Sequence, residues 1–200
     1  MAIITAINGN TVTVDRDFTN WLTSTPIGAN LFLVSENARL VPTDFVLRIA
    51  NKENVGFSVA NNQAIRNSTG DYILLLNPDT VVEENTFRDT IAFMDTNPDA
   101  GALGVIMIDG KGNYLPESKR GLPTPSVAFY KISGLTSLFS KSKRFARYYM
   151  GHLSENETNE VEILAGAFML MRKEALDKAG LLDEDYFMYG EDIDLSYRIT

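Results

Sequence analysis

Residues 72–82 read YILLLNPDTVV, and this stretch decides the fold class. Its first five residues are apolar or aromatic without a break, which is typical of a strand buried on both faces of a sheet. Pro78 ends the strand because it has no N–H to donate. Open parallel sheets bind ligands at this carboxyl end, so Asp79 is predicted at a cleft, where a carboxylate can hold Mg²⁺ or Mn²⁺ against a diphosphate. The residues alone also allow an aspartate that only caps the next helix.

Strands and helices alternate around this stretch. Apolar runs predict strands at residues 2–7, 31–34, 102–108 and 161–171. Apolar residues at helical spacing predict helices at residues 57–65, 87–94 and 172–179, and another that begins near Glu191. Residues 11–22 fit either a helix or a hairpin. The alternation indicates an α/β fold with a mainly parallel central sheet and helices on both faces, and we treat residues 1–200 as a single domain.

Composition excludes several classes of site and partner. The 200 residues contain no cysteine and one histidine, which rules out disulfides, thiolate zinc sites and multi-histidine metal sites within one chain. The formal net charge of −8 argues against nucleic-acid binding. No signal sequence and no long apolar run is recognisable, so we expect a cytoplasmic protein.

The charge is unevenly distributed. Residues 119–147 contain seven basic residues and no acidic one, so the remainder sums to −8 − 7 = −15. This segment lies in an apparent insertion at about residues 116–160, where the strand–helix rhythm stops. Apolar residues lie among the cations, which is typical of a segment at an anionic membrane surface, here the inner face of the cell membrane. The alternative is a mobile flap whose cations face the acidic body or a donor phosphate.

A second chemical stretch, YFMYGEDIDL, covers residues 186–195. Glu191, Asp192 and Asp194 stand in the first turn of a predicted helix. Acidic residues there often serve only the helix dipole. Neighbouring rings and anions would raise the pKa of a carboxyl, as a general base at neutral pH requires, whereas the helix N-terminus opposes this rise.

Four stretches in this order resemble family 2 glycosyltransferases, and most of all the rhamnosyltransferase-like branch that builds cell-surface polysaccharides. They are NKENVGFSVANNQAI (51–65), GDYILLLNPDTVV (70–82), ILAGAFMLMRKEAL (163–176) and GLLDEDYFMYGEDIDLSYR (180–198). The first 50 residues match more loosely, although LFLVSENAR (31–39) is similar to the segment that reads the nucleotide base. The family continues beyond the position of Thr200, so the domain is expected to be truncated at its C-terminus.

The resemblance implies a GT-A type nucleotide-diphospho-sugar transferase fold and gives roles to matching residues. Asp79 matches the ligand of a Mg²⁺ or Mn²⁺ cofactor, and Asn77 matches a contact to the sugar or ribose. Asp192 matches the catalytic base, with Glu191 beside it. The other matches line the donor: Glu36 and Asn37 at the base, Asn54, Gly56 and Asn62 along the nucleotide, and Gly166 and Ala167 beneath the sugar.

The implied function is that of an inverting glycosyltransferase. It would move a hexose or deoxyhexose from a nucleotide-diphospho-sugar to a hydroxyl of a saccharide or a lipid-linked saccharide. The alternatives are a non-catalytic nucleotide-sugar binding module and an inactive fragment of such an enzyme. A nucleotidyltransferase is disfavoured because no glycine-rich, basic phosphate loop follows the first strand.

Overall fold

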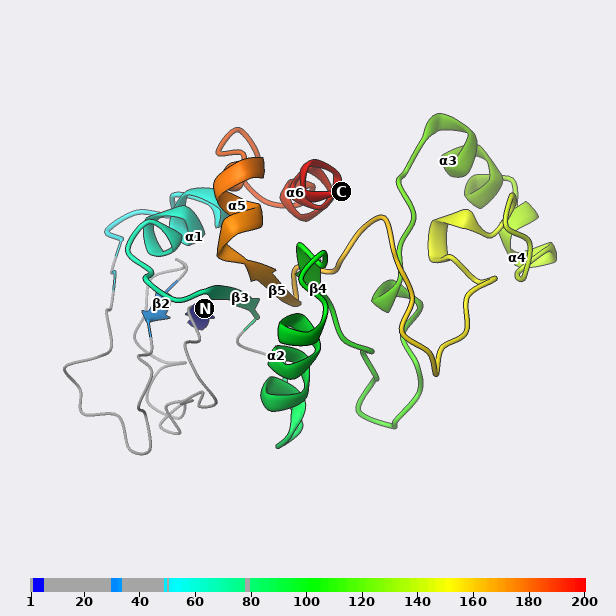
Figure 1. Ribbon diagram of the computed structural model, residues 1–200. Helices are drawn as coiled ribbons and strands as arrows, with labels where there is room; N and C mark the ends of the chain where they lie inside the picture. The colour runs from blue at the N-terminus through cyan, green and yellow to red at the C-terminus, as the bar shows by residue number, and fades with distance from the viewer. Residues whose placement is uncertain (1, 6–29, 34–48, 50, 78–79) are drawn as a thin grey trace.

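The computed structural model describes residues 2–5, 30–33, 49, 51–77 and 80–200 (Figure 1). The predictions for Glu36, Asn37, Asp79 and residues 11–22 lie outside these ranges. Within them the chain has the α/β architecture that the sequence predicts.

Strand β3 (Tyr72–Leu76) forms where the sequence predicts it, and all five of its residues are buried, as predicted. It pairs antiparallel with β5 (Phe168–Arg172), with Leu74 opposite Leu170. The far edge of β5 pairs antiparallel with the short strand β4 (Ala102–Leu103). The order β3-β5-β4 therefore forms a three-stranded sheet whose middle strand comes from late in the sequence.

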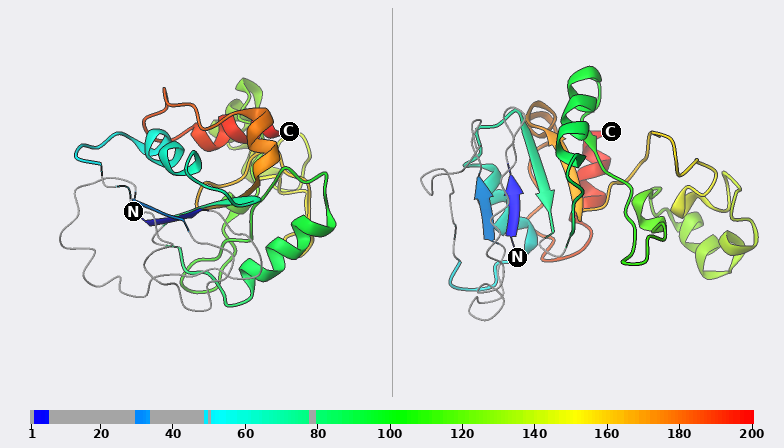
Figure 2. Two further views of the ribbon diagram at one scale, coloured as in Figure 1. Left: turned by 60° about the vertical axis from the view of Figure 1, so that its left-hand side comes forward. Right: turned by 90° about the horizontal axis from the view of Figure 1, so that it is seen from below.

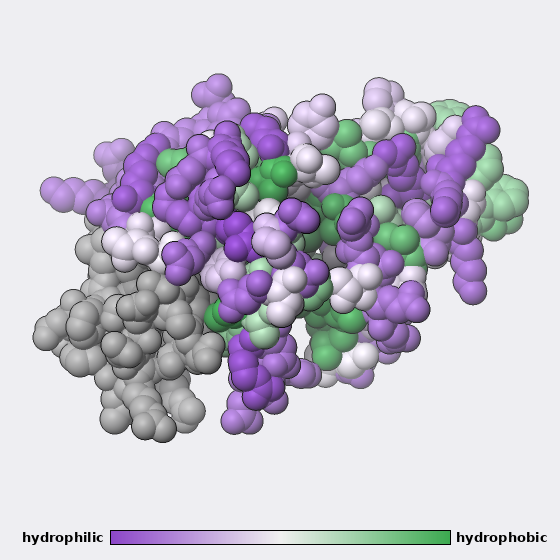
Figure 3. All heavy atoms as spheres, viewed as in Figure 1, coloured by the Kyte–Doolittle hydropathy of each residue, from purple (hydrophilic) through white to green (hydrophobic). Residues whose placement is uncertain are grey.

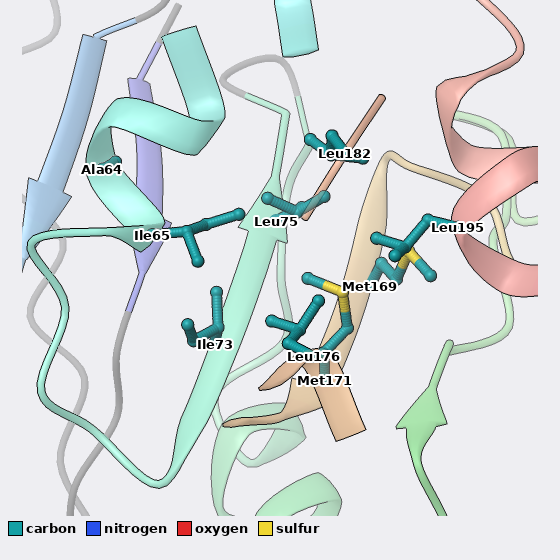
Figure 4. Packing of buried hydrophobic residues seen from close by; sticks show 9 residues of the cluster. All are labelled: Ala64, Ile65, Ile73, Leu75, Met169, Met171, Leu176, Leu182 and Leu195. Carbon is teal, nitrogen blue, oxygen red and sulfur yellow. The ribbon is translucent and has the colours of Figure 1, made fainter. Parts of the chain in front are cut away.

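Helices cover both faces of this sheet. Alternate residues of β3 and β5 point to opposite sides, and both sets are apolar, so each face has to be covered. Figure 4 shows one face packing against α1 (Phe57–Ile65), α5 (Lys173–Ala179) and α6 (Glu191–Ile199). This cluster consists of Ala64, Ile65, Ile73, Leu75, Met169, Met171, Leu176, Leu182 and Leu195. The other face packs against Ile91 and Met94 of α2 (Thr86–Thr96). All four helices lie close to where the apolar spacing predicts them.

The mainly parallel sheet that the sequence predicts is not confirmed. Strands β1 (Ala2–Thr5) and β2 (Asn30–Leu33) pair in parallel, and β1 lies beside β3 (Figure 2). Strands β3 and β4 also share one direction, since both are antiparallel to β5. The prediction fails at β5, which inserts between them. The segment after β4 brings the chain to the carboxyl end of β3, where β5 begins opposite Leu76. From there β5 can cross the sheet only in the direction opposite to β3.

Two predicted strands are shorter in the structure because their ends leave the sheet. After β4 the backbone of Met107 bonds to Ser118 and Leu115, and the carbonyl of Asp109 accepts from the Gly112 amide in a turn. Before β5, Ile163 pairs with Arg120 in an isolated bridge. Residues 104–167 thus pair largely among themselves instead of extending the sheet.

The predicted insertion carries its own small elements and extends away from the sheet (Figure 1). It contains the 3-10 turns η3 (Pro116–Ser118) and η4 (Arg147–Tyr149) and the helices α3 (Pro125–Ile132) and α4 (Leu135–Leu138). Thr124 caps α3 by accepting a hydrogen bond from the Val127 amide, and Pro125 takes the first helical position, where no N–H is needed. Across the described ranges, no helix is long and apolar enough to cross a membrane.

Candidate active site

The candidate site forms where β3 ends and β5 begins. The amide of Asn77 donates to the carbonyl of Ala167 at 3.0 Å, and the Thr80 hydroxyl reaches the same carbonyl at 3.4 Å. The antiparallel pairing of β3 and β5 dictates this contact, because it sets Leu76 opposite Phe168. The predicted sugar contact Asn77 and the predicted sugar floor, Gly166 and Ala167, therefore lie side by side.

The first turn of α6 brings Asp192 to the same place. Gly190, at a φ of +100°, starts this helix in a left-handed conformation that glycine adopts at little cost. The Gly166 amide lies 3.4 Å from Oδ2 of Asp192, and a Cβ built on Gly166 would stand 3.5 Å from the Asp192 Cβ. The loop before β5 is therefore in van der Waals contact with the predicted base.

Arg120 from the insertion is the partner of Asp192, and sequence reasoning did not single it out. Its Nη2 forms an ion pair with Asp192 Oδ2 and also donates to the Leu164 carbonyl at 3.0 Å. Both charged side chains are largely buried, with 18% and 17% of their surface exposed, so solvent screens the pair less than an exposed one. The only sequence signal was the basic run at residues 119–147, which does not distinguish Arg120 from six other cations.

Glu191 differs from Asp192 in its environment. Glu191 is 7% exposed, and its Oε2 has no hydrogen-bond partner within the described part of the chain. Burial raises the pKa of the Glu191 carboxyl, and the charge of Asp192 raises it further, whereas a backbone hydrogen bond opposes the rise. The two adjacent carboxyls therefore differ: Asp192 is paired with a cation, and Glu191 is buried with no cation partner in the described part of the chain.

The residues predicted along the nucleotide hold α1 against the loop that leads to α6. Asn62 is buried, and its side chain bonds both the backbone N–H and C=O of Leu182 as well as the Glu184 carboxylate. The Asn54 side chain accepts from the Gly56 amide. Gly56 has a φ of +85°, and a Cβ there would stand 2.8 Å from the Phe187 carbonyl oxygen. Asn62 and Gly56 thus join α1 to the segment that presents Asp192.

A pocket of about 270 Å³ lies at the first turn of α6. It is lined by Leu122, Tyr186, Gly190, Ile193, Asp194 and Tyr197. The insertion and α6 both contribute to this lining, whereas Arg120 and Asp192 are not part of it. Two tyrosines give its wall aromatic surface with polar ends.

Comparison with known proteins decides the family. The family described as Glycosyl transferase family 2 matches residues 38–180 of this chain. The chain belongs to this family. The resemblance inferred from the four sequence stretches is therefore confirmed, and membership implies the GT-A type of fold.

The relatives of this family 2 chain are named as transferases of a hexose or of rhamnose. It is 26% identical over 174 residues to an N-acetylglucosaminyl-diphospho-decaprenol L-rhamnosyltransferase of Mycobacterium tuberculosis, covering 82% of this chain and 53% of the relative. It is 28% identical to rhamnosyltransferase WbbL of Escherichia coli K12, covering 72% and 54%. A low-salt glycan biosynthesis hexosyltransferase, Agl10 of Haloferax volcanii, is 24% identical, covering 72% and 43%. The chain spans about half the length of the curated relatives it matches.

A divalent cation is typical of this family, and the side chains at the end of β3 suit one. Within the described ranges, no three carboxylate or imidazole side chains come together. Mg²⁺ is commonly held by one or two carboxylates while phosphates and waters complete its shell, so a cluster of three is not required. The end of β3 offers oxygen ligands only, with the Asn77 amide next to the position of Asp79. This donor chemistry fits a hard cation such as Mg²⁺ or Mn²⁺.

Proposed function

We propose that this chain is the donor-binding and catalytic part of an inverting glycosyltransferase. It moves a hexose or deoxyhexose from a nucleotide-diphospho-sugar to an acceptor hydroxyl. The observation that carries the proposal is the convergence of Asn77, Gly166, Ala167 and Asp192 at the end of β3, in a chain of family 2. Open α/β sheets bind nucleotides at this edge, where loops can approach a phosphate closely.

Asp192 is the proposed general base. Its carboxylate offers about four acceptor positions. Arg120, the Gly166 amide and the Ile193 amide occupy three of them, which leaves one for the acceptor proton. As Asp192 takes that proton, the acceptor oxygen attacks the anomeric carbon, and the bond from this carbon to the diphosphate oxygen breaks. A single displacement inverts the configuration, and the nucleoside diphosphate leaves with the bond's electron pair.

Arg120 is the proposed positioning residue for this base. A charge-assisted hydrogen bond is about twice as strong as a neutral one, so the ion pair fixes the direction of the Asp192 carboxylate. The second bond from Arg120 to the Leu164 carbonyl ties the pair to the loop before β5. Arg120 therefore holds the Asp192 carboxylate beside Gly166, where the sugar would lie.

Asp79 is the residue proposed to hold Mg²⁺ or Mn²⁺, and Asn77 is proposed to contact the sugar or ribose beside it. When bound, the cation offsets the negative charge that accumulates on the departing diphosphate. Replacing Asp79 with alanine should remove the metal-dependent part of donor binding. Equal donor affinity and equal metal dependence in the variant would move the metal ligand elsewhere.

The acceptor is proposed to be a saccharide or a lipid-linked saccharide, in cell-surface polysaccharide synthesis. The pocket of about 270 Å³ at the first turn of α6 supports an acceptor on this side, because Tyr186 and Tyr197 offer apolar faces together with hydroxyls. The mycobacterial relative is named for a decaprenol-linked acceptor. The proposed place of action is the cytoplasmic face of the membrane, where such an acceptor would be reached through residues 119–147.

One experiment separates this enzyme from a non-catalytic binding module, which the partial coverage of the relatives also allows. The chain is screened by thermal unfolding against UDP-, GDP- and dTDP-sugars, with and without Mn²⁺. A ligand at 100 times its Kd adds about 2.7 kcal/mol of stability, which such a scan detects. Stabilising donors are then tested for transfer and for donor hydrolysis. Stabilisation without either reaction would favour the module, and no stabilisation by any donor would contradict both.

A further inference from the structure

The insertion presents apolar side chains to solvent at its outer end. Ile132 at the end of α3 is 88% exposed, Leu138 at the end of α4 is 73% exposed, and Phe129 is 62% exposed. Ring contacts connect Phe129 to Tyr130, Tyr130 to Phe145, and Phe145 to Phe139, so the aromatic part of this surface is continuous. Figure 3 shows hydrophobic residues gathered at the end of the molecule where α3 and α4 lie. We call this the α3–α4 face.

These residues are not the core of the insertion. Val127, Ala146 and Met150 are buried beneath them, and Thr136 bonds the Phe145 carbonyl. The insertion therefore has a small interior of its own, and its exposed apolar groups are additional to it. Contiguous exposed apolar surface with a charged border marks an interaction site.

The structure divides the seven cations of residues 119–147 into two groups. Four are engaged inside the chain: Lys119 with the carbonyls of Leu153 and Ser154, Arg120 with Asp192, Arg147 with Glu162, and Lys131 over the Tyr148 ring. The others are Lys141, Lys143 and Arg144, all exposed and without an ion pair among the described residues; Arg144 donates only to the Tyr130 hydroxyl, at 3.3 Å. Arg144 also lies over Phe145, which joins the charges to the apolar surface.

We propose that the α3–α4 face, with Lys141, Lys143 and Arg144, docks on an anionic phospholipid bilayer. Apolar residues enter the headgroup boundary while the cations meet the lipid charges, as in other interfacial segments. No acidic residue occurs from position 118 to 154, whereas the rest of the chain is strongly acidic. An anionic surface therefore attracts this face and repels the remainder, which fixes the orientation of the molecule. A second copy of the chain is a poor occupant because it would bring two sets of like charges together.

The inference rests on the proposed function, for which it names the partner surface. The insertion that carries the α3–α4 face connects directly to the proposed base. Arg120, which lies near the start of the insertion, forms an ion pair with Asp192. A lipid-linked acceptor held in the bilayer would then be presented close to the catalytic carboxylate. The vesicle experiment below requires neither a donor nor turnover, so its failure is distinct from a failure of the proposed function.

The test is co-sedimentation of the chain with two kinds of vesicle. One is phosphatidylcholine alone, and the other is equal parts phosphatidylcholine and phosphatidylglycerol. We expect binding to the anionic vesicles only, and weaker binding at high salt because salt screens exposed charges. Each cation near such a surface changes partitioning about fivefold, so replacing Lys141, Lys143 and Arg144 with glutamine should lower it roughly 100-fold. Ile132→Ser with Leu138→Ser should also abolish binding.

Matched variants control for net charge and for lost apolar surface. The control for net charge replaces Lys111, Lys173 and Lys178 with glutamine, which removes three positive charges outside the insertion. The control for apolar surface is Val81→Ser, which removes an apolar side chain outside the insertion that is 96% exposed. Both controls should bind like the parent chain. Equal recovery in the supernatant with both vesicles would overturn the proposal. Loss of vesicle binding in the control variants would also overturn it. So would a chain that binds no vesicle but forms a dimer in sedimentation velocity, if that dimer is lost in the Ile132→Ser, Leu138→Ser variant.

Discussion

The amide of Asn77 donates a hydrogen bond to the carbonyl of Ala167, across 90 positions of sequence (167 − 77), at 3.0 Å. This bond joins the end of β3 to the start of β5. It sets the predicted sugar contact beside the predicted sugar floor, and Gly166 then reaches Asp192. The antiparallel direction of β5 is therefore what assembles the site, and a parallel β5 would have placed Ala167 at the other end of the sheet.

Asp192→Asn should lower the rate of sugar transfer about 10²-fold or more, the usual range for a lost general base, with donor affinity nearly unchanged. Asparagine keeps the shape but cannot take the acceptor proton. Initial-rate kinetics and calorimetric titration of the donor measure the two effects. Asp183→Asn, an exposed carboxylate in the preceding loop, serves as the control and should behave like the parent chain. A selective loss of donor affinity would make Asp192 a donor contact instead.

Arg120→Gln should lower kcat at least tenfold while the donor KM stays constant, because the ion pair orients Asp192 and does not contact the donor in our proposal. Arg120→Lys should recover part of the rate, since it keeps the charge but loses the planar fork. In the Asp192→Asn background the same change should add little. Arg147→Gln breaks the insertion's other ion pair, with Glu162, and is the matched control. A fall in kcat of the same size in Arg147→Gln would indicate a merely structural effect.

Gly56→Ala should destabilise the fold by about 1–3 kcal/mol, because a residue with a Cβ is strained at this φ of +85° and would also meet the Phe187 carbonyl. Gly112→Ala isolates the first cause, since Gly112 has a φ of +82° but no atom within 4 Å of a built Cβ. Urea unfolding of both variants measures the difference. Equal costs would mean that the approach of residues 56 and 187 contributes nothing.

Glu191→Gln should stabilise the protein near neutral pH. Burial raises the pKa of Glu191 in the folded state, so the folded protein favours the protonated form. The stability that Glu191 contributes is then complete below the ordinary glutamate pKa, about 4.3, and is lost as the pH rises through the folded value. The difference in Tm between variant and parent should therefore be positive at neutral pH and shrink in acid. If the difference in Tm stays constant or has the opposite sign between neutral and acidic pH, the pKa of Glu191 is not raised by folding.

Local patterns predicted the elements well, and long-range pairing explains what they missed. The apolar run at 72–76 and the helical spacing at 57–65 and 87–94 depend on neighbours in sequence, and β3, α1 and α2 formed there. The direction of β5 depends on where residues 104–167 bring the chain, which no local pattern encodes. Arg120 could not be chosen among seven cations, because its partner lies 72 residues away. The bonds from the Asn62 amide to Leu182 and Glu184 likewise join residues more than 100 positions apart, which no local pattern indicates.

The most direct test of the account is to locate the bound donor. The backbone amide chemical shifts of the chain are followed by NMR during a titration. The ligand is the nucleotide-sugar that stabilises the chain most in the thermal screen. Diamagnetic Mg²⁺ replaces Mn²⁺ as the metal ion. The account predicts that the amides of Asn77, Gly166, Ala167 and Asp192 shift together and saturate at one Kd, while those of α3 and α4 stay in place. Shifts confined to other parts of the chain, with these four amides unmoved, would contradict a donor site at the end of β3.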